Sequence, residues 1–115
     1  MSTDFKTYCI IGDPIDHSLS PAIHNAAFTT LGLNCSYIAF RVQEGQLKNS
    51  MDSLRAINIG GFNVTMPHKV TVLNYVDRSD KIAEMVGAAN TVNNEGGKFH
   101  AYNTDVVGFI EPLRQ

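Results

Sequence analysis

Short apolar runs alternate with amphipathic segments along most of the chain, which is the pattern of strands alternating with helices. Residues 7–12, 35–42 and 62–65 are rich in β-branched and aromatic side chains and predict buried strands. Residues 21–31 and 46–57 repeat apolar side chains at helical spacing and predict helices. Because parallel strands are joined by crossover connections, this alternation predicts a mainly parallel sheet covered on both faces.

Glycine, proline and serine residues indicate where these elements begin and end. Ser20 before Pro21 predicts an N-cap followed by the first helical position, and Gly32 predicts the end of that helix. The Gly60-Gly61 pair predicts the end of the second helix. Pro67 is expected to open a third, short helical segment.

The last third of the chain predicts a hairpin between two helices. Residues 90–93 and 98–102 flank Asn94-Glu95-Gly96-Gly97, which is a turn signal. One helix is expected after Ser79 as its cap, and a last helix over residues 105–111. We therefore expect an α/β fold, namely a three-layer α/β/α domain with a mixed, mainly parallel sheet and an antiparallel edge hairpin.

The composition limits the chain to one domain. Its 115 residues can bury roughly two thirds of the surface that the unfolded chain exposes, enough for a single core. A net charge of -2 without runs of like charge gives no electrostatic footprint for nucleic acid or an anionic membrane. Cys9 and Cys35 are too few for a disulfide framework, so reduced thiols are expected. Without a long apolar stretch or a signal-peptide pattern, we expect a soluble, cytoplasmic protein.

Polar segments follow several predicted strands, at the place where sheets of this kind bind ligands. Ser18 and Ser20 lie two residues apart ahead of a predicted helix. In an extended loop both hydroxyls would face one small anion, such as a carboxylate, near the positive end of that helix. The alternative is that Ser20 only caps the helix and Ser18 is a solvated loop residue.

A second polar group is built from Asn63, Thr65 and Lys69. Alternation along a strand places Asn63 and Thr65 on one side. Lys69, two residues past Pro67, is expected in the first turn of the following helix, where it can lean over the strand end. The alternative for Lys69 is an ordinary solvated charge.

A third polar group comes from Asn90 and the segment Asn103-Thr104-Asp105. Asn90 offers a donor and an acceptor to a hydroxyl, and Asp105 is a carboxylate at a predicted helix start. Capping roles are equally compatible with both residues. The four histidines have no partner at a metal-ligand spacing, so we predict no metal site. There is no GxGxxG or P-loop, so no cofactor-binding residue is predicted in this chain.

Four segments of the chain carry a family resemblance when they are taken together. They are Gly12-Asp13-Pro14-Ile15-Asp16-His17-Ser18-Leu19-Ser20-Pro21-Ala22-Ile23-His24-Asn25, Asn63-Val64-Thr65-Met66-Pro67-His68-Lys69, Gly87-Ala88-Ala89-Asn90-Thr91 and Asn103-Thr104-Asp105. In order and spacing they resemble the shikimate dehydrogenase family, specifically its N-terminal, substrate-binding (catalytic) domain. The chain departs from the pattern at Lys81, where many members are acidic, and at Val106, where glycine is common.

The resemblance implies an activity and assigns roles to residues. The family interconverts shikimate and 3-dehydroshikimate with NADP in aromatic amino-acid biosynthesis. By analogy, Ser18 and Ser20 would hold the substrate carboxylate. Lys69 and Asp105 would be the catalytic pair that removes the hydroxyl proton as hydride leaves for the nicotinamide. The residues implied to hold the ring hydroxyls are Asn63, Thr65, Asn90 and Asp105, with Lys69 beside them in the substrate site.

The resemblance also implies a domain organisation. Residues 1–115 would be a shikimate-binding catalytic domain, and the NADP-binding domain, its partner in cis or in trans, is absent from this chain. The chain alone is then expected to bind substrate without turning it over, because hydride transfer needs a bound nicotinamide. Two alternatives remain open: a quinate/shikimate dehydrogenase domain, and a non-catalytic binding module for small hydroxylated acids.

Overall fold

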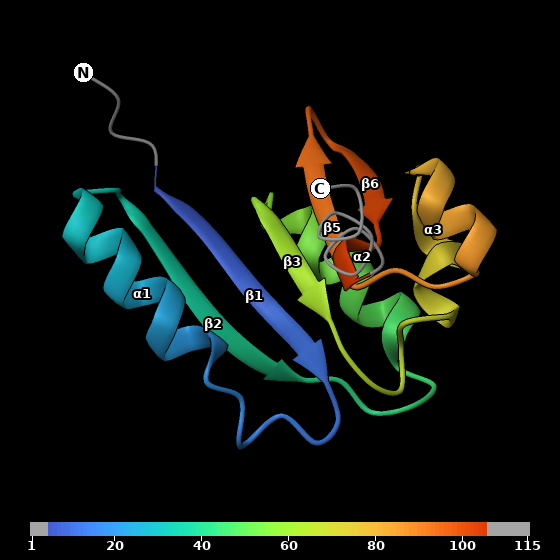
Figure 1. The fold of residues 1–115 in the computed structure, drawn as a ribbon, viewed down its shortest axis with the longest axis horizontal. Helices are drawn as coiled ribbons and strands as arrows, with labels where there is room; N and C mark the ends of the chain where they lie inside the picture. The colour runs from blue at the N-terminus through green and yellow to red at the C-terminus, as the bar shows by residue number, and fades with distance from the viewer. Residues whose placement is uncertain (1–4, 106–115) are drawn as a thin grey trace, which may run out of the picture.

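The computed structural model describes residues 5–105 and contains one six-stranded sheet with helices on both faces (Figure 1). The strand order across the sheet is β2-β1-β3-β5-β6-β4. The elements in chain order are β1 (Lys6–Gly12), α1 (Ser20–Leu31), β2 (Cys35–Arg41), α2 (Leu47–Ala56), β3 (Gly61–Val64), the 3-10 helix η1 (Thr71–Tyr75), β4 (Arg78–Ser79), α3 (Lys81–Val86), β5 (Thr91–Glu95) and β6 (Lys98–Tyr102).

The sheet is mixed, as the sequence predicts. Strand β1 runs parallel to β2 and β3, and β4 runs parallel to β6. Strand β5 runs antiparallel to both of its neighbours, β3 and β6. The predicted α/β fold with a mixed sheet is therefore confirmed.

The β5–β6 hairpin is confirmed, but its expected place at the sheet edge is wrong. Strand β5 pairs with β3 inside the sheet, and the two-residue strand β4 covers the outer side of β6. The pairing of β4 is extended by backbone hydrogen bonds from Asp77 to Phe99 (2.9 Å) and from Asp80 to Ala101 (2.8 Å). This edge forms from a segment too short to produce a periodic sequence signal.

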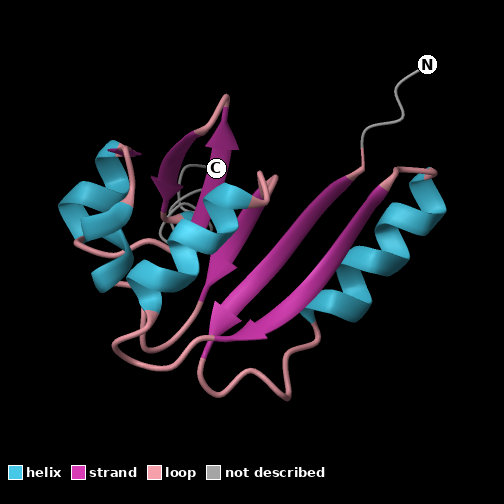
Figure 2. Cartoon of the chain, turned by 180° about the vertical axis from the view of Figure 1, so that it is seen from behind, coloured by secondary structure: helices cyan, strands magenta, loops and turns pink. Residues whose placement is uncertain are grey.

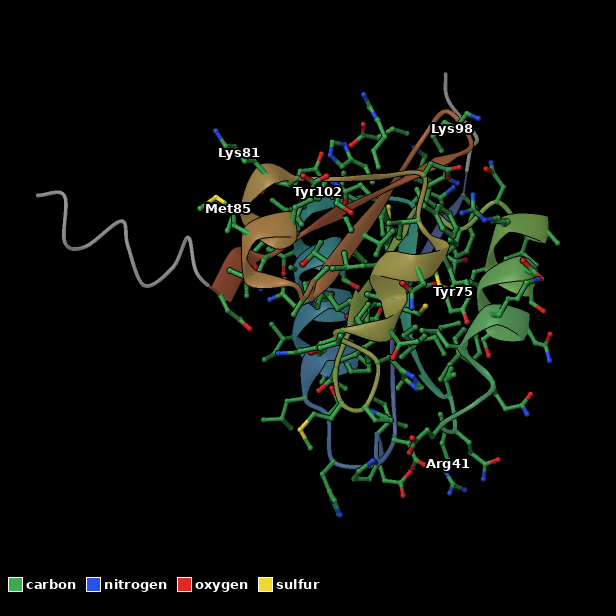
Figure 3. All side chains as sticks on the ribbon, turned by 90° about the vertical axis from the view of Figure 1, so that its right-hand side faces the viewer. Arg41, Tyr75, Lys81, Met85, Lys98 and Tyr102 are labelled. Atoms are coloured by element: carbon green, nitrogen blue, oxygen red, sulfur yellow. The ribbon has the colours of Figure 1, made fainter. Side chains whose placement is uncertain are left out.

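Helix α1 lies on one face of the sheet and α2 on the other, as the two opposite views show (Figures 1 and 2). The hydrophobic core lies on the α2 side, where α2, η1 and α3 meet alternate residues of the central strands. Figure 3 shows Tyr75 between η1 and α2, and this side chain packs against the core. The fully buried large side chains are Phe99, Ile11, Met51, Ile59, Val72, Val92 and Cys9.

The start of α1 differs from the prediction by one residue. The helix includes Ser20, and Leu19 is the N-cap, because the carbonyl of Leu19 accepts the first helical hydrogen bond from Ile23 (3.1 Å). The Ser18 hydroxyl accepts the N–H of Ser20 (3.2 Å), so Ser18 satisfies a donor at this helix start. The predicted end at Gly32 is confirmed, with a φ of 68° in the left-handed region.

The Gly60-Gly61 pair does not end α2, which stops at Ala56, four residues earlier than Gly60. Gly61 instead begins β3. A Cβ on Gly60 would lie 2.8 Å from the Tyr8 ring, and one on Gly61 would lie 3.0 Å from the Val92 carbonyl oxygen. These glycines therefore allow the close approach of β3 to its neighbours.

The segment after β3 is a pair of turns leading to η1, so the predicted helix from Pro67 is wrong in its extent. Lys69 lies in a turn ahead of Thr71, not in the first turn of a helix. The Lys69 carbonyl accepts the N–H of Ala89 (2.8 Å), while the N–H of Leu73 goes to Val70 (3.3 Å) in the 3-10 manner. In an α-helix the carbonyl of Lys69 would accept the N–H of Leu73. Here it accepts the N–H of Ala89 instead, so a tertiary hydrogen bond replaces the α-helical one.

Two further helix predictions concern the last part of the chain. The helix after Ser79 is confirmed as α3, but Asp80 is its N-cap and Ser79 belongs to β4. Lys81 and Met85 project from α3 into solvent (Figure 3), and Met85 is 77% exposed. The helix predicted over residues 105–111 lies, from residue 106 on, outside the described residues. None of the described helices is long and apolar enough to cross a membrane.

Candidate functional site

The predicted polar groups meet at one edge of the sheet. Strands β1 and β3 are parallel and end at Gly12 and Val64, so the segments that follow them leave the sheet side by side. Because β5 is antiparallel to β3, its first residue, Thr91, lies at the same edge, next to the end of β6 at Tyr102. This edge therefore collects the four segments singled out in the sequence.

The serine loop joins β1 to α1. The N–H of Ser18 donates to the carbonyl of Ile15 (3.1 Å), and the buried side chain of Ile15 anchors the loop. Ser18 and Ser20 are both half-buried. The structure thus brings the two serines together beside the N-terminus of a 12-residue helix, where the backbone dipole favours negative charge.

Tyr37 on β2 connects the serines to β3. Its hydroxyl donates to Asn63 Oδ1 (2.7 Å), and Ser20 forms a hydrogen bond with the same hydroxyl. Burial raises the pKa of Tyr37 to about 12, with Cys9 acting in the same direction and Ser20 opposing it. The His24 ring stacks on Tyr37 with centroids 4.3 Å apart. Tyr37 is therefore a neutral, fixed donor in the middle of the site.

Asn90 is the centre of the second half of the network. Its side-chain nitrogen donates to Thr104 Oγ1 and to Asp105 Oδ1, both at 2.9 Å. Its side-chain oxygen accepts from the N–H of Thr104 (3.0 Å) and from the Thr91 hydroxyl (3.1 Å). Asn63 Nδ2 reaches Thr91 Oγ1 at 3.3 Å, which closes the chain of contacts between the two halves. The orientation of the Asn90 carboxamide is therefore fixed by its partners.

Lys69 and Asp105 form an ion pair at the open side of the network. The Lys69 Nζ lies 3.1 Å from Asp105 Oδ2, while Asn90 holds the other carboxylate oxygen. The two side chains are 38% and 65% exposed, so both are accessible to a small ligand. A cation and a carboxylate in direct contact can exchange a proton with a hydroxyl group placed between them.

Thr65 takes a different position from the other predicted residues. Its N–H donates to the carbonyl of Ile11 (3.0 Å), and its methyl group faces Gly12, where a Cβ would lie only 2.2 Å away. Between residues 5 and 105 the Thr65 hydroxyl has no hydrogen-bond partner. The structure therefore places Thr65 at the site edge without joining it to the network.

Six of the seven predicted site residues are linked by these contacts, directly or through Tyr37 and Thr91. The sequence prediction missed Tyr37 and gave no separate role to Thr104, whose hydroxyl and backbone N–H both contact the Asn90 side chain. The sequence does contain a signal for Tyr37. It is a tyrosine inside an apolar run, and a buried tyrosine hydroxyl needs a hydrogen-bond partner. Among residues 5–105, no group of His, Cys, Asp and Glu side chains has the composition of a metal site.

Comparison with known proteins gives relatives that share this domain. The chain is 51% identical over 110 residues to a shikimate dehydrogenase (NADP(+)) of Nitrosopumilus maritimus, covering 96% of this chain and 40% of the relative. It is 48% identical to the shikimate dehydrogenase (NADP(+)) of Bacillus subtilis, covering 94% and 39%. The chain thus spans about 40% of the length of these curated relatives.

Solved structures give the same result. Shikimate 5-dehydrogenase of Listeria monocytogenes, in complex with shikimate and NAD, aligns over 99% of this chain and 39% of its own, with 40% identity and a TM-score of 0.91. The ligand-free 5-ketofructose reductase of a Gluconobacter strain aligns over 98% and 41%, with 29% identity and a TM-score of 0.90.

A protein family described as the shikimate dehydrogenase substrate binding domain matches residues 10–92, which contain three of the four segments that carried the resemblance. The resemblance seen in the sequence is therefore confirmed, and this chain belongs to the shikimate dehydrogenase substrate binding domain family.

Proposed function

We propose that this chain is the substrate-binding domain of an NADP-dependent shikimate dehydrogenase and that its polar edge holds shikimate or 3-dehydroshikimate. The observation that carries the proposal is the convergence of Lys69, Asp105 and Asn90 in one contact cluster, with the ammonium 3.1 Å from the carboxylate. Family membership and the shikimate-bound Listeria relative support the same assignment.

Ser18 and Ser20 bind the substrate carboxylate in this proposal. Both residues are half-buried beside the N-terminus of α1, and the first turn of that helix has no acidic side chain. Hydroxyl donors and a helix N-terminus together favour an anion. The carboxylate would then fix the orientation of the ring toward β3 and β5.

The ring hydroxyls are held by side chains that are already oriented by one another. Asn63 is fixed by Tyr37 and Thr91, and Asn90 is fixed by Thr104 and Asp105. A rigid set of donors and acceptors binds a hydroxylated ring with little loss of side-chain entropy. The Thr65 hydroxyl adds a further group for the ligand. The full set in this role is Asn63, Thr65, Asn90 and Asp105, with Lys69 beside them.

Lys69 and Asp105 act as the catalytic pair on the reacting hydroxyl. NADP, when it is bound, supplies the hydride acceptor. Asp105 and Lys69 together remove the hydroxyl proton during oxidation, and they return it to the carbonyl oxygen during reduction. The contact from Asn90 to Asp105 Oδ1 keeps that carboxylate aimed at the reacting oxygen during both steps.

NADP belongs to the part of the enzyme outside residues 1–115. This chain aligns with only 39–40% of the length of the relatives named NADP-dependent, which are therefore roughly two and a half times as long as this chain. The sequence here also lacks a GxGxxG motif. We therefore assign the NADP-binding domain, in cis or in trans, as the partner of this chain. The domain alone binds substrate without turnover, and we place it in the cytoplasm.

Other ligands, and a non-catalytic function, compete with this assignment. Quinate has the carboxylate and the ring hydroxyls of shikimate and one hydroxyl more. The 5-ketofructose reductase relative acts, by its name, on a sugar without a carboxylate. A non-catalytic module would bind the same acids without using Lys69 and Asp105 for chemistry. The serine pair separates acids from neutral sugars, because only an acid gains from an anion site.

Titration of the ¹⁵N-labelled chain with shikimate, quinate and fructose tests the proposal. We expect shikimate to shift the amides of Ser18, Ser20 and Asn90 in a saturable way, with fructose leaving them unchanged. The double variant Ser18→Ala, Ser20→Ala should weaken shikimate binding at least tenfold, the loss of one or two hydrogen bonds to a charged group. Saturable binding by fructose but not by shikimate would overturn the proposal, and unchanged binding in the double variant rejects the serine assignment.

A further inference from the structure

We propose that His68 is a positioning residue, which holds the loop of residues 65–70 in the conformation that presents Thr65 and Lys69 to the ligand. This inference rests on the proposed function, because Thr65 and Lys69 matter only if the polar edge is a ligand site. His68 itself is 2% exposed, and its side chain forms a hydrogen bond with Val42, which does not belong to the network of Asn90 and Asp105.

The His68 side chain ties this loop to the ends of two strands. Its Nε2 forms a hydrogen bond with the carbonyl oxygen of Val42, directly after β2. Because a carbonyl oxygen can only accept, Nε2 must carry the ring proton. The N–H of Val42 in turn donates to the carbonyl of Gly12 at the end of β1 (2.9 Å). The loop is thus linked through one imidazole to β2 and β1.

Backbone hydrogen bonds hold the loop on its other sides. Thr65 donates to Ile11 (3.0 Å), and the carbonyl of Met66 accepts the N–H of Asp13 (2.9 Å). The carbonyl of Lys69 accepts the N–H of Ala89 (2.8 Å), one residue before Asn90. These contacts fix the loop toward β1 and β5, and His68 fixes it toward β2. The position of the Lys69 backbone, and with it the reach of its ammonium to Asp105, depends on all of these contacts.

The hydrogen bond gives this buried ring a defined orientation. A cavity of about 280 Å³ lies near Pro67, Thr71 and Tyr75, but His68 itself is only 2% exposed. A ring of the same size without a donor could fill the same space, but it would leave the carbonyl of Val42 without this hydrogen bond. The directed contact to Val42 is therefore what such a ring cannot replace.

Two substitutions at His68 separate the hydrogen bond from the ring. His68→Phe keeps a ring and removes the donor, whereas His68→Gln places an amide N–H near the position of Nε2. In NMR titrations of the 115-residue chain, we expect His68→Phe to bind shikimate about threefold to tenfold more weakly, the effect of one lost neutral hydrogen bond. His68→Gln should restore the affinity to within about twofold of the parent.

Amide hydrogen exchange gives a readout that a general loss of stability does not produce. In His68→Phe, the N–H groups of Val72 and Ala89, which bond to His68 and Lys69, should exchange faster. The N–H of Asn90, bonded to Tyr102 in the hairpin (3.0 Å), should keep the parent rate and serves as the internal control.

Three results would overturn the inference: parent-like shikimate affinity in His68→Phe, a Gln variant as weak as the Phe variant, or equal acceleration of exchange at Asn90 and Ala89. Failure of the proposed function looks different. In that case the parent chain binds no shikimate, while selective exchange at Val72 and Ala89 in His68→Phe still demonstrates the tie between His68 and the loop.

Discussion

The two faces of the sheet are built in opposite ways. On the α2 side, alternate residues of β1, β3, β5 and β6 form a continuous buried core with α2, η1 and α3. On the other side, α1 has no buried residue, and Ile23 and Leu31 are 63% and 70% exposed. The α2 side therefore supplies most of the hydrophobic stabilisation, since that scales with the apolar surface removed from water.

On the α1 side, hydrogen bonds and a few ring contacts of α1 with Tyr8 and Tyr37 take the place of an extended core. Asn25 of α1 donates to the carbonyl of Tyr37 and accepts its N–H, both at 2.8 Å, which also satisfies the open edge of β2. From Tyr37 the hydrogen bonds continue through Asn63 toward the site. This difference teaches that stability and ligand binding in this chain are separable, because they depend on different side chains and different forces.

The largest test of this separation is Phe99→Ala. Phe99 is fully buried, packs edge-on against Phe62 with centroids 5.4 Å apart, and has the Arg55 guanidinium 4.0 Å above its ring. Its truncation should lower the free energy of unfolding by about 3–5 kcal/mol. The matched exposed site, Leu31→Ala, should stay within about 0.5 kcal/mol of the parent. Urea unfolding followed by circular dichroism measures both variants. Equal losses in the free energy of unfolding would show that the two faces contribute equally to stability.

The opposite test is Lys69→Ala, which should affect chemistry and spare the fold. With the chain joined to the cofactor-binding part of a relative such as the Bacillus subtilis enzyme, we expect turnover of shikimate to fall by about 100-fold or more, the usual contribution of a positioned proton-transfer group. The ion pair with Asp105 is largely exposed, so thermal stability should change little. The exposed control Lys48→Ala should keep parent turnover; comparable loss in both variants contradicts a catalytic role.

A smaller effect is expected from Tyr37→Phe, which removes only the hydroxyl that contacts Asn63 and Ser20. The variant leaves the Asn63 oxygen without its 2.7 Å donor. Shikimate affinity in NMR titration should fall about threefold to tenfold, since only hydrogen bonds between neutral groups are lost. Tyr8→Phe is the matched control, because Tyr8 is half-buried on the neighbouring strand and its hydroxyl has no hydrogen bond within residues 5–105. Equal affinity in the two variants would contradict the role of Tyr37.

The sequence allowed the strands to be predicted well because strand periodicity and core burial agree. Cys9 and Ile11 both face the core, as a period of two requires, and Phe62 and Val64 do the same. The meeting of the serines, Asn90 and Asp105 was also predictable, since parallel strands end at one edge and the family resemblance linked the segments. Periodicity and motif order therefore gave the architecture and most of the site.

Contacts between distant segments could not be predicted in the same way. The edge position of β4 depends on its pairing with β6, and the turn at Lys69 depends on a hydrogen bond from Ala89, twenty residues later. The role of Tyr37 depends on which side chain faces its hydroxyl across the sheet. None of these features has a local pattern, because each is decided by tertiary hydrogen bonds that override local propensity.

The smallest expected effect is a pH dependence of stability that comes from the core side. On the core side, Asp77 accepts the N–H of Phe99 (2.8 Å) and pairs with Arg55 (2.9 Å); the hydrogen bond from Phe99, then that from Arg55, lowers the pKa of this carboxyl. A carboxyl whose pKa is lower in the folded chain stabilises the fold above its unfolded pKa of about 3.9, and this contribution disappears as the pH falls through the folded pKa. We therefore expect Asp77→Asn to be less stable than the parent at pH 6, and we expect the difference to shrink as the pH falls through the lowered pKa of Asp77 in the folded chain. Urea midpoints of both chains across this range measure the difference. A gap that stays constant with pH would mean that Asp77 acts through shape and not through charge.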